Sequence, residues 1–291
     1  MILSLQMIAI LLNSLLNDVP AQAEPKLYGN KVQQGGLPST CSILSYNTSK
    51  TLPCTGSIVQ VGNQIQVITS SHCKLPDTQL KVQCDGDSSW LNLTESTGGS
   101  VHCSGPNAAE KCAAYTFSTP LSPNRVKSLH PIRMMKKSDQ TTFFTSGMKS
   151  IQPGVVCQAD AMNTDENGAI TGKLHAKANQ ITLNNGLLSQ KIESPSLTAV
   201  IANIVVRFNT PGDPLCASSG ATPTQQKILI AKALAPYGEL FLSPGDSGGP
   251  LYCKRPKDSE WTLVGVTASN DFEQNYYENR WTPIYLDSGS K

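Results

Sequence analysis

Short runs of β-branched residues, separated by turn-forming residues, constrain the fold of this chain most strongly. Residues 57–61 and 199–206 are rich in valine, isoleucine and threonine, and glycine, asparagine and proline lie between such runs. Asn185 and Gly186 separate two apolar segments and predict a tight hairpin. Residues 225–235 hold good helix formers and predict a helix. Many short strands at regular spacing predict an all-β protein built as a sandwich or as barrels.

Residues 1–23 predict a signal peptide, so we expect a secreted protein. Residues 8–16 are apolar, and Ala21 and Ala23 form a small-x-small cleavage site before Glu24. A membrane anchor is the alternative, but the apolar run is too short to span a bilayer and polar residues interrupt it. We therefore expect an extracellular location, or the periplasm if the source is a Gram-negative bacterium, and no membrane partner.

Composition argues against a nucleic-acid partner and against a metal site. The formal net charge is +2 and no dense run of lysine and arginine occurs, so we expect no nucleic acid to bind. All nine cysteines follow the predicted signal peptide, and none forms a Cys-x-x-Cys pair. Export makes disulfides the expected state of these thiols, and no metal is expected. An odd number leaves at least one thiol free or paired between molecules.

The stretch GDSGGPLYC at residues 245–253 places a serine, Ser247, among glycines. Turn chemistry alone would explain it, unless the chain supplies what a nucleophilic serine needs. A serine hydroxyl is a poor nucleophile without a neighbouring base, usually histidine. His72 is the candidate among four histidines, because a β-type run delivers it to a strand end just before Cys73. A bridge from Cys73 to Cys54, 19 residues upstream, would close the hairpin that carries His72.

Two blocks of the sequence resemble the chymotrypsin-like (trypsin-like) serine protease family. CTGSIVQVGNQIQVITSSHC, residues 54–73, is similar to the family's histidine block, and GDSGGPLYC followed by WTLVGV is similar to its serine block. The resemblance implies an all-β fold of two six-stranded antiparallel β-barrels, residues 27–150 and 151–291, with the active site in the cleft between them. It also implies a secreted serine endopeptidase that acts on protein or peptide substrates and needs no cofactor.

The resemblance implies a catalytic triad of Ser247, His72 and an acid that follows His72 in the chain. The candidate acids are Asp77, Asp85, Asp87, Glu95, Glu110 and Asp139. Asp139 matches the family pattern, because it follows a His-Pro pair and precedes a strand-like run. A disulfide-rich insertion at residues 75–129 would account for the long gap between His72 and Asp139.

The same resemblance assigns further roles near the serine. The backbone N–H groups of Gly245 and Ser247 would form the oxyanion hole. Cys253 would pair with Cys157. Five cysteines keep no assigned partner: Cys41, Cys84, Cys103, Cys112 and Cys216.

Specificity follows from the residues at the family's substrate-binding positions. Phe241 stands at the base of the family's specificity pocket, and Ala268 and Asn270 belong to the segment that pairs with the substrate backbone. No acid occupies position 241, so a substrate Lys or Arg would have no charge partner. We therefore expect cleavage after small or uncharged residues.

The chain start predicts activation by cleavage. Residues 24–26 would form a short propeptide, which an activating protease removes by cutting after Lys26. In the family, the freed amine, here that of Leu27, pairs with the acid before the nucleophile, here Asp246. This pairing turns residues 245–247 into the conformation of the oxyanion hole. The alternative is a protein that is active as secreted.

A catalytically inactive relative that serves as a binding or adhesion module is the main alternative function. In its support, Ala268-Ser269-Asn270 replaces the family's Ser-Trp-Gly, and the cysteine that usually precedes GDSGG is missing. Inactive relatives commonly lose the serine or the histidine, whereas Ser247 and His72 both remain in frame. An acyl hydrolase is excluded, because that fold has the chain order Ser, Asp, His.

Overall fold

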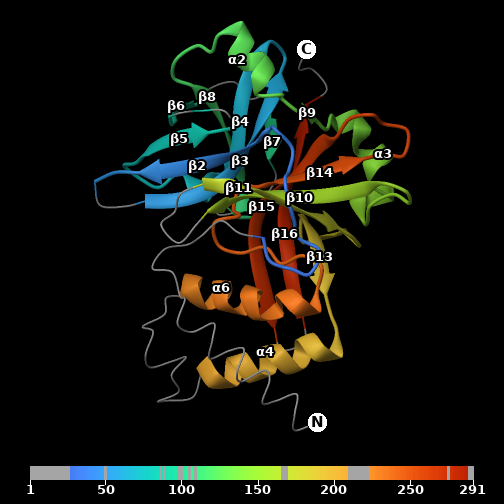
Figure 1. The fold of residues 1–291 in the computed structure, drawn as a ribbon. Helices are drawn as coiled ribbons and strands as arrows, with labels where there is room; N and C mark the ends of the chain where they lie inside the picture. Colours follow the sequence, from blue (N-terminus) through green and yellow to red (C-terminus); the bar gives the residue numbers. More distant parts are fainter. Residues whose placement is uncertain are drawn as a thin grey trace.

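The structure is a computed structural model that describes residues 27–48, 51–85, 87, 89–96, 101–103, 106–107, 110–164, 170–208, 223–273 and 276–287. Within these residues, two largely antiparallel β-sheets pack against each other, and a pair of helices lies beside the second sheet (Figure 1). The predicted signal peptide, the predicted propeptide and Cys216 lie outside the described residues.

The first sheet is a closed barrel of six antiparallel strands, joined in the order β2-β3-β4-β8-β6-β5. Its strands are β2 (Thr40–Tyr46), β3 (Thr51–Val61), β4 (Gln64–Ser70), β5 (Gln79–Gln83), β6 (Leu91–Glu95) and β8 (Cys112–Phe117). Apolar side chains such as Ile43, Val67 and Val82 are buried in one core, because β-branched residues pack well on a pleated surface. Strands β5, β6 and β8 all come from residues 75–129. The expected insertion there is wrong, since this stretch supplies half of the barrel.

The second sheet holds ten strands, and its main path runs β1-β11-β10-β14-β15-β16-β13-β12. Its strands are β1 (Gln33–Gln34), β7 (Val101–Cys103), β9 (Arg133–Met134), β10 (Val156–Thr164), β11 (Ile170–Ala178), β12 (Thr182–Asn184), β13 (Leu187–Ile192), β14 (Pro250–Lys254), β15 (Thr262–Glu273) and β16 (Tyr276–Leu286). A closed six-stranded barrel together with this second large sheet confirms the predicted all-β, chymotrypsin-like fold. The predicted hairpin is also confirmed, because Asn185 and Gly186 connect β12 to β13 with φ of 48° and 80°.

Apolar side chains from both sheets share one core where the sheets meet. Val59 of β3 and Ile68 of β4 pack in the same cluster as Tyr252 of β14, Val266 of β15 and Ile284 of β16. Burial of such side chains is the main source of favourable free energy in folding. The two sheets therefore share one hydrophobic core, to which β4 and β14 both contribute.

Helices are few and mostly short. They are α2 (Pro123–Ser128), α3 (Gln140–Phe143), α4 (Pro195–Phe208) and α6 (Pro223–Leu234), with 3-10 turns η1 (Ser71–Cys73), η3 (Lys137–Asp139), η4 (Ser146–Met148) and η5 (Ala235–Tyr237). The helix predicted at residues 225–235 is confirmed as α6. No helix in the described part of the chain is long and apolar enough to cross a membrane.

Helix α4 occupies the residues 199–206 that were expected to form a strand, so that prediction is wrong. Ser194 Oγ accepts a hydrogen bond from the N–H of Leu197 at 3.1 Å, and Pro195 fills the first turn; both are helix start signals. Leu197 and Ile201 are fully buried in a cluster with residues of α6. Packing against a second helix outweighs the weak β preference of the β-branched residues.

Four disulfides join described cysteines. The predicted pairs Cys54–Cys73 and Cys157–Cys253 are confirmed. The further pairs, which sequence left open, are Cys41–Cys84 and Cys103–Cys112.

A buried carboxylate ties the second sheet to the segment that enters the first. Asp160 of β10 is 1% exposed and accepts hydrogen bonds from the N–H of Leu37 at 2.6 Å and from Thr40 Oγ1 at 3.2 Å. Burial raises the pKa of Asp160 above its usual value, and the bonds from Gln158 and Leu37 oppose this shift in part. Protonation of Asp160 therefore favours the folded state.

The pKa shift predicts how stability depends on pH. Because the folded pKa of Asp160 is raised, the wild-type free energy of unfolding falls as pH rises from about 4 through that pKa. Asp160→Asn removes this dependence. The free energy of unfolding of the variant minus that of wild type, measured in urea, should therefore rise from about pH 4 to about pH 8. Asp258→Asn is the control. Arg255 lowers the pKa of Asp258, so the free energy of unfolding of this variant minus that of wild type should change in the opposite direction between about pH 4 and about pH 8. Equal differences at both pH values for Asp160→Asn would contradict the prediction.

Candidate active site

The loop that carries Ser247 is attached to both sheets. The N–H of Thr55, within β3, donates to the carbonyl oxygen of Ser247 at 2.9 Å. On the other side, the N–H of Gly248 donates to the carbonyl oxygen of Thr267 at 2.8 Å, and the N–H of Thr267 donates to that of Gly249 at 2.7 Å. These bonds fix the position of Ser247 between the first barrel and β15.

The same part of the first barrel carries His72. Residues 64–70 form β4, which ends directly before the turn η1 that holds His72. Cys73 is bonded to Cys54, the neighbour of Thr55, and Cys73 Sγ lies 3.5 Å from the carbonyl oxygen of Ser247. The structure therefore brings the segment of His72 against the loop of Ser247.

A buried serine holds the ring of His72. Ser70 Oγ lies 2.9 Å from His72 Nδ1 and 3.5 Å from the carbonyl oxygen of Lys111, and Ser70 is 1% exposed. A hydroxyl that donates to a carbonyl can accept from Nδ1–H, which leaves Nε2 free of a proton. Ser70 thus favours the tautomer that a general base requires. The sequence analysis missed this residue, although its place two residues before His72 on the same strand is a local signal.

Asp139 makes no hydrogen bond or ion pair with His72, so its assignment as the acid of the triad stays a prediction. Asp139 lies in η3 and forms an ion pair with Arg133 of β9, and it accepts a hydrogen bond from the N–H of Lys136 at 3.4 Å. None of its hydrogen bonds or ion pairs with described residues involves His72. Arg133 pairs with Thr262, at the beginning of β15, whereas the loop of Ser247 contacts Thr267.

The backbone at Gly245 has the conformation that an anion-binding turn needs. Gly245 has φ of 102°, which favours glycine, and it is buried. The N–H groups of Gly245 and Ser247 donate no hydrogen bond to any described residue. Two donors without acceptors, close to the serine hydroxyl, can bind a developing oxyanion.

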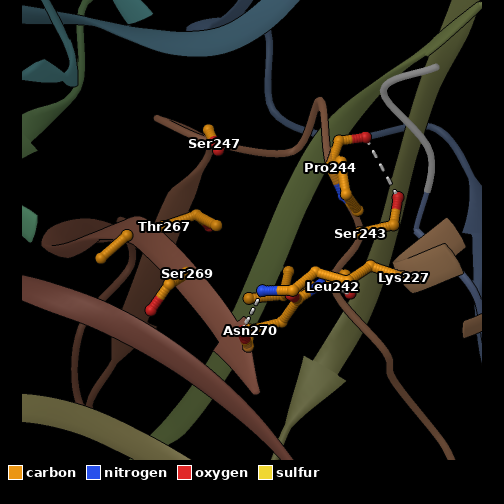
Figure 2. Close-up of a pocket in the computed structure, with 9 residues that line it drawn as sticks. Lys227, Leu242, Ser243, Pro244, Ser247, Thr267, Ser269 and Asn270 are labelled. Atoms are coloured by element: carbon orange, nitrogen blue, oxygen red, sulfur yellow. Dashed lines mark hydrogen bonds between the residues drawn. The ribbon is translucent and has the colours of Figure 1, made fainter. Parts of the chain in front are cut away.

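A cavity of about 320 Å³ opens beside Ser247 (Figure 2). It is lined by Lys227, Leu242, Ser243, Pro244, Ser247, Thr267, Ala268, Ser269 and Asn270. Ala268 and Asn270 therefore lie where sequence analysis expected them, next to the serine. No group of three or more His, Cys, Asp or Glu side chains within the described ranges is placed to hold a metal ion.

Phe241 does not line this cavity, which corrects its assignment as a substrate contact. It is 0% exposed, and its ring packs edge-to-face on Tyr277 at a centroid distance of 5.0 Å. Its N–H and carbonyl groups exchange hydrogen bonds with those of Tyr28. The expectation of small or uncharged residues rested on Phe241 and loses that basis.

The segment that begins at Leu27 is docked in the second sheet. Leu27 is 2% exposed and belongs to a core cluster, and Tyr28 pairs with Phe241. Asp246 is also fully buried, and its Oδ2 accepts a hydrogen bond from the N–H of Ser243 at 2.7 Å. Lys26 lies outside the described residues, so activation by cleavage there stays a prediction.

No comparison with known proteins assigns this site. No protein-family model matches the chain, and no curated protein matches it. Among solved structures, the protease Anisep from Arthrobacter nicotinovorans is similar, with 9% identity and a TM-score of 0.49 over 88% of this chain and 94% of that chain. The thermostable serine protease AL20 from an extremophilic microorganism shares 12% identity, with a TM-score of 0.45 over 87% and 93% of the two chains. The assignment of site residues rests on the geometry alone.

A pair of glycine variants tests the contact between the loop and the first barrel. A Cβ at Gly248 would overlap Thr69 Oγ1 and the carbonyl oxygen of Thr55, whereas a Cβ at Gly186 would meet nothing within 4 Å. Both glycines have φ near 80°, so Gly186→Ala measures the backbone strain alone, about 1–2 kcal/mol. Gly248→Ala should lower the free energy of unfolding in urea by clearly more. Equal losses would show that the loop does not pack as described.

Proposed function

We propose that this protein is a secreted serine endopeptidase, with Ser247 as nucleophile and His72 as general base. One observation supports this most directly: the hydrogen bond from Thr55 to Ser247 holds the serine loop against β3, whose Cys54 is bonded to Cys73, the neighbour of His72. A serine needs such a neighbouring base to be nucleophilic at neutral pH. The cavity beside Ser247 supplies space for a substrate side chain.

The proposed reaction proceeds through an acyl-enzyme. Ser247 Oγ attacks the carbonyl carbon of the scissile bond while its proton passes to His72 Nε2. The N–H groups of Gly245 and Ser247 bind the oxyanion that forms. The C–N bond then breaks, and His72 gives the proton to the leaving amine. Water then attacks the carbonyl carbon of the acyl-enzyme with His72 again as base. The bond to Ser247 Oγ breaks, and the new carboxylic acid end of the peptide is released.

Ser70 is a hydrogen-bond partner of His72 at Nδ1, the ring atom that faces the acid in this class of enzyme. Its hydroxyl, 2.9 Å from His72 Nδ1, orients the ring but carries no charge. A neutral partner stabilises the imidazolium less than a carboxylate does, because hydrogen bonds to ionised groups are roughly twice as strong. We therefore propose a Ser247–His72 pair with Ser70 as positioning residue.

Secretion and activation belong to the same proposal. The four disulfides are typical of proteins that fold in an oxidising compartment, in agreement with the predicted signal peptide. Cleavage after Lys26 would free the amine of Leu27, whose side chain packs in the core cluster of the second sheet. Protein or peptide substrates are the proposed partners, along with an activating protease.

Covalent labelling tests the nucleophile. A fluorophosphonate probe should label wild type that has been cleaved after Lys26, whereas Ser247→Ala cleaved in the same way should remain unlabelled because the probe reacts only with an activated serine. His72→Ala should slow labelling by several orders of magnitude, since serine and base act as one unit. Wild type that resists labelling, while the chain is folded by circular dichroism, would instead favour the inactive binding module.

A second pair of variants separates Ser70 from Asp139. Ser70→Ala should lower kcat by about 10-fold or more with little change in KM, because the ring of His72 loses its orienting partner. Ser70→Thr keeps the hydroxyl and should recover much of the rate. Asp139→Asn should stay within about 2-fold of wild type, since it breaks only a surface ion pair. A loss of about 10⁴-fold in Asp139→Asn would restore Asp139 as the acid and contradict the role of Ser70.

A further inference from the structure

The helix α6 brings a positive charge to the cavity beside Ser247. Lys227 is the only one of the nine lining residues that carries a formal charge. Its Nζ donates a hydrogen bond to the carbonyl oxygen of Asn270 at 3.2 Å, which holds the ammonium group at the wall opposite the loop (Figure 2). The other lining side chains are apolar, hydroxyl or amide groups. The charge of the cavity is therefore set by Lys227.

The ammonium group of Lys227 has unused donors. A lysine ammonium carries three N–H donors, and Lys227 makes this one hydrogen bond and no ion pair with any described residue. The nearby carboxylates are held by other groups. Asp246 is fully buried and bonded to the N–H of Ser243, and Asp271 pairs with Arg280 at 3.2 Å. No described acid therefore neutralises the charge of Lys227.

Two hydroxyl groups in the cavity wall also lack partners. Thr267 Oγ1 and Ser269 Oγ are buried and make no hydrogen bond in the described part of the chain. A buried polar group without a partner is unfavourable, so each hydroxyl gains from an acceptor. A carboxylate offers two acceptor oxygens with about four lone-pair sites. A negatively charged side chain in the cavity would gain most from the free donors of Lys227.

We propose that Lys227 is a specificity-determining residue that binds the carboxylate of an aspartate or glutamate immediately before the scissile bond. The inference rests on the proposed function, because it assumes that Ser247 attacks the carbonyl of the residue whose side chain fills the cavity. The position of Ser247 on the wall of that cavity supports this assignment. It replaces the expectation of small or uncharged residues.

Lys227 does not act as the base for Ser247. Its Nζ is bound to the carbonyl oxygen of Asn270 on β15, and in Figure 2 the side chain runs toward Asn270. The base is His72, on the side of the loop that contacts the first barrel. Lys227 therefore contacts the substrate side chain only.

The test uses protein cleaved after Lys26, so that it begins at Leu27, and fluorogenic peptides that differ only in the residue before the scissile bond: Glu, Gln, Ala or Lys. Wild type should cleave after Glu with a kcat/KM about 10- to 100-fold higher than after Gln, which has the same shape without the charge. Lys227→Met should reduce this Glu/Gln ratio to about 1, and Lys227→Arg should keep most of it. Lys232→Met, on the same helix but outside the cavity wall, should keep the wild-type ratio.

A measurement on wild type alone covers the case in which the Lys227 variants do not fold. If the preference for Glu comes from a charge, the Glu/Gln ratio should fall as NaCl rises from about 0.05 M to 1 M. A ratio near 1 in wild type that the fluorophosphonate probe does label would overturn the role of Lys227 and leave the proposed function standing. Wild type that is neither labelled nor able to cleave any peptide would overturn both.

Discussion

The hydrogen bond from the N–H of Thr55 to the carbonyl oxygen of Ser247 is the contact on which the site depends. It joins a strand of the first barrel to a loop of the second sheet, nearly 200 residues further along the chain. The loop approaches so closely at Gly248 that a single methyl group would overlap Thr69 and Thr55. Only glycine satisfies both this approach and the positive φ of that position. The separation of Ser247 from His72 is therefore set by the packing between the two sheets.

Two further features hold this contact in place. The Cys54–Cys73 disulfide fixes the β3–β4 ends, so that Thr55 and His72 cannot separate. Asp160 binds the N–H of Leu37 and the hydroxyl of Thr40, which ties β10 to the entrance of the first barrel. Because Asp160 is buried and its pKa is raised, the same interaction makes the joint between the sheets sensitive to pH.

Sequence patterns predicted the local features well and the long-range contacts poorly. The hairpin at residues 185–186, the disulfide of His72's hairpin and the glycine loop each depend on neighbours in the chain. The choice of Asp139 depended on a His-Pro pair and a strand-like run, and it made residues 75–129 resemble an insertion. Those residues instead close the first barrel. The strand expected at residues 199–206 failed for a similar reason, because its apolar face found a helix as partner.

The sequence by itself determined that this is a disulfide-bonded β protein with a Gly-Asp-Ser-Gly-Gly loop and a histidine at a strand end. Those properties follow from side-chain shape, backbone freedom of glycine and cysteine spacing within short segments. Tertiary structure decided which groups lie near Ser247: Ser70 contacts His72, and Lys227 rather than Phe241 lines the cavity. The physical reason is that strand pairing and helix packing bring together residues that are far apart in the chain. Patterns within short segments do not predict those contacts.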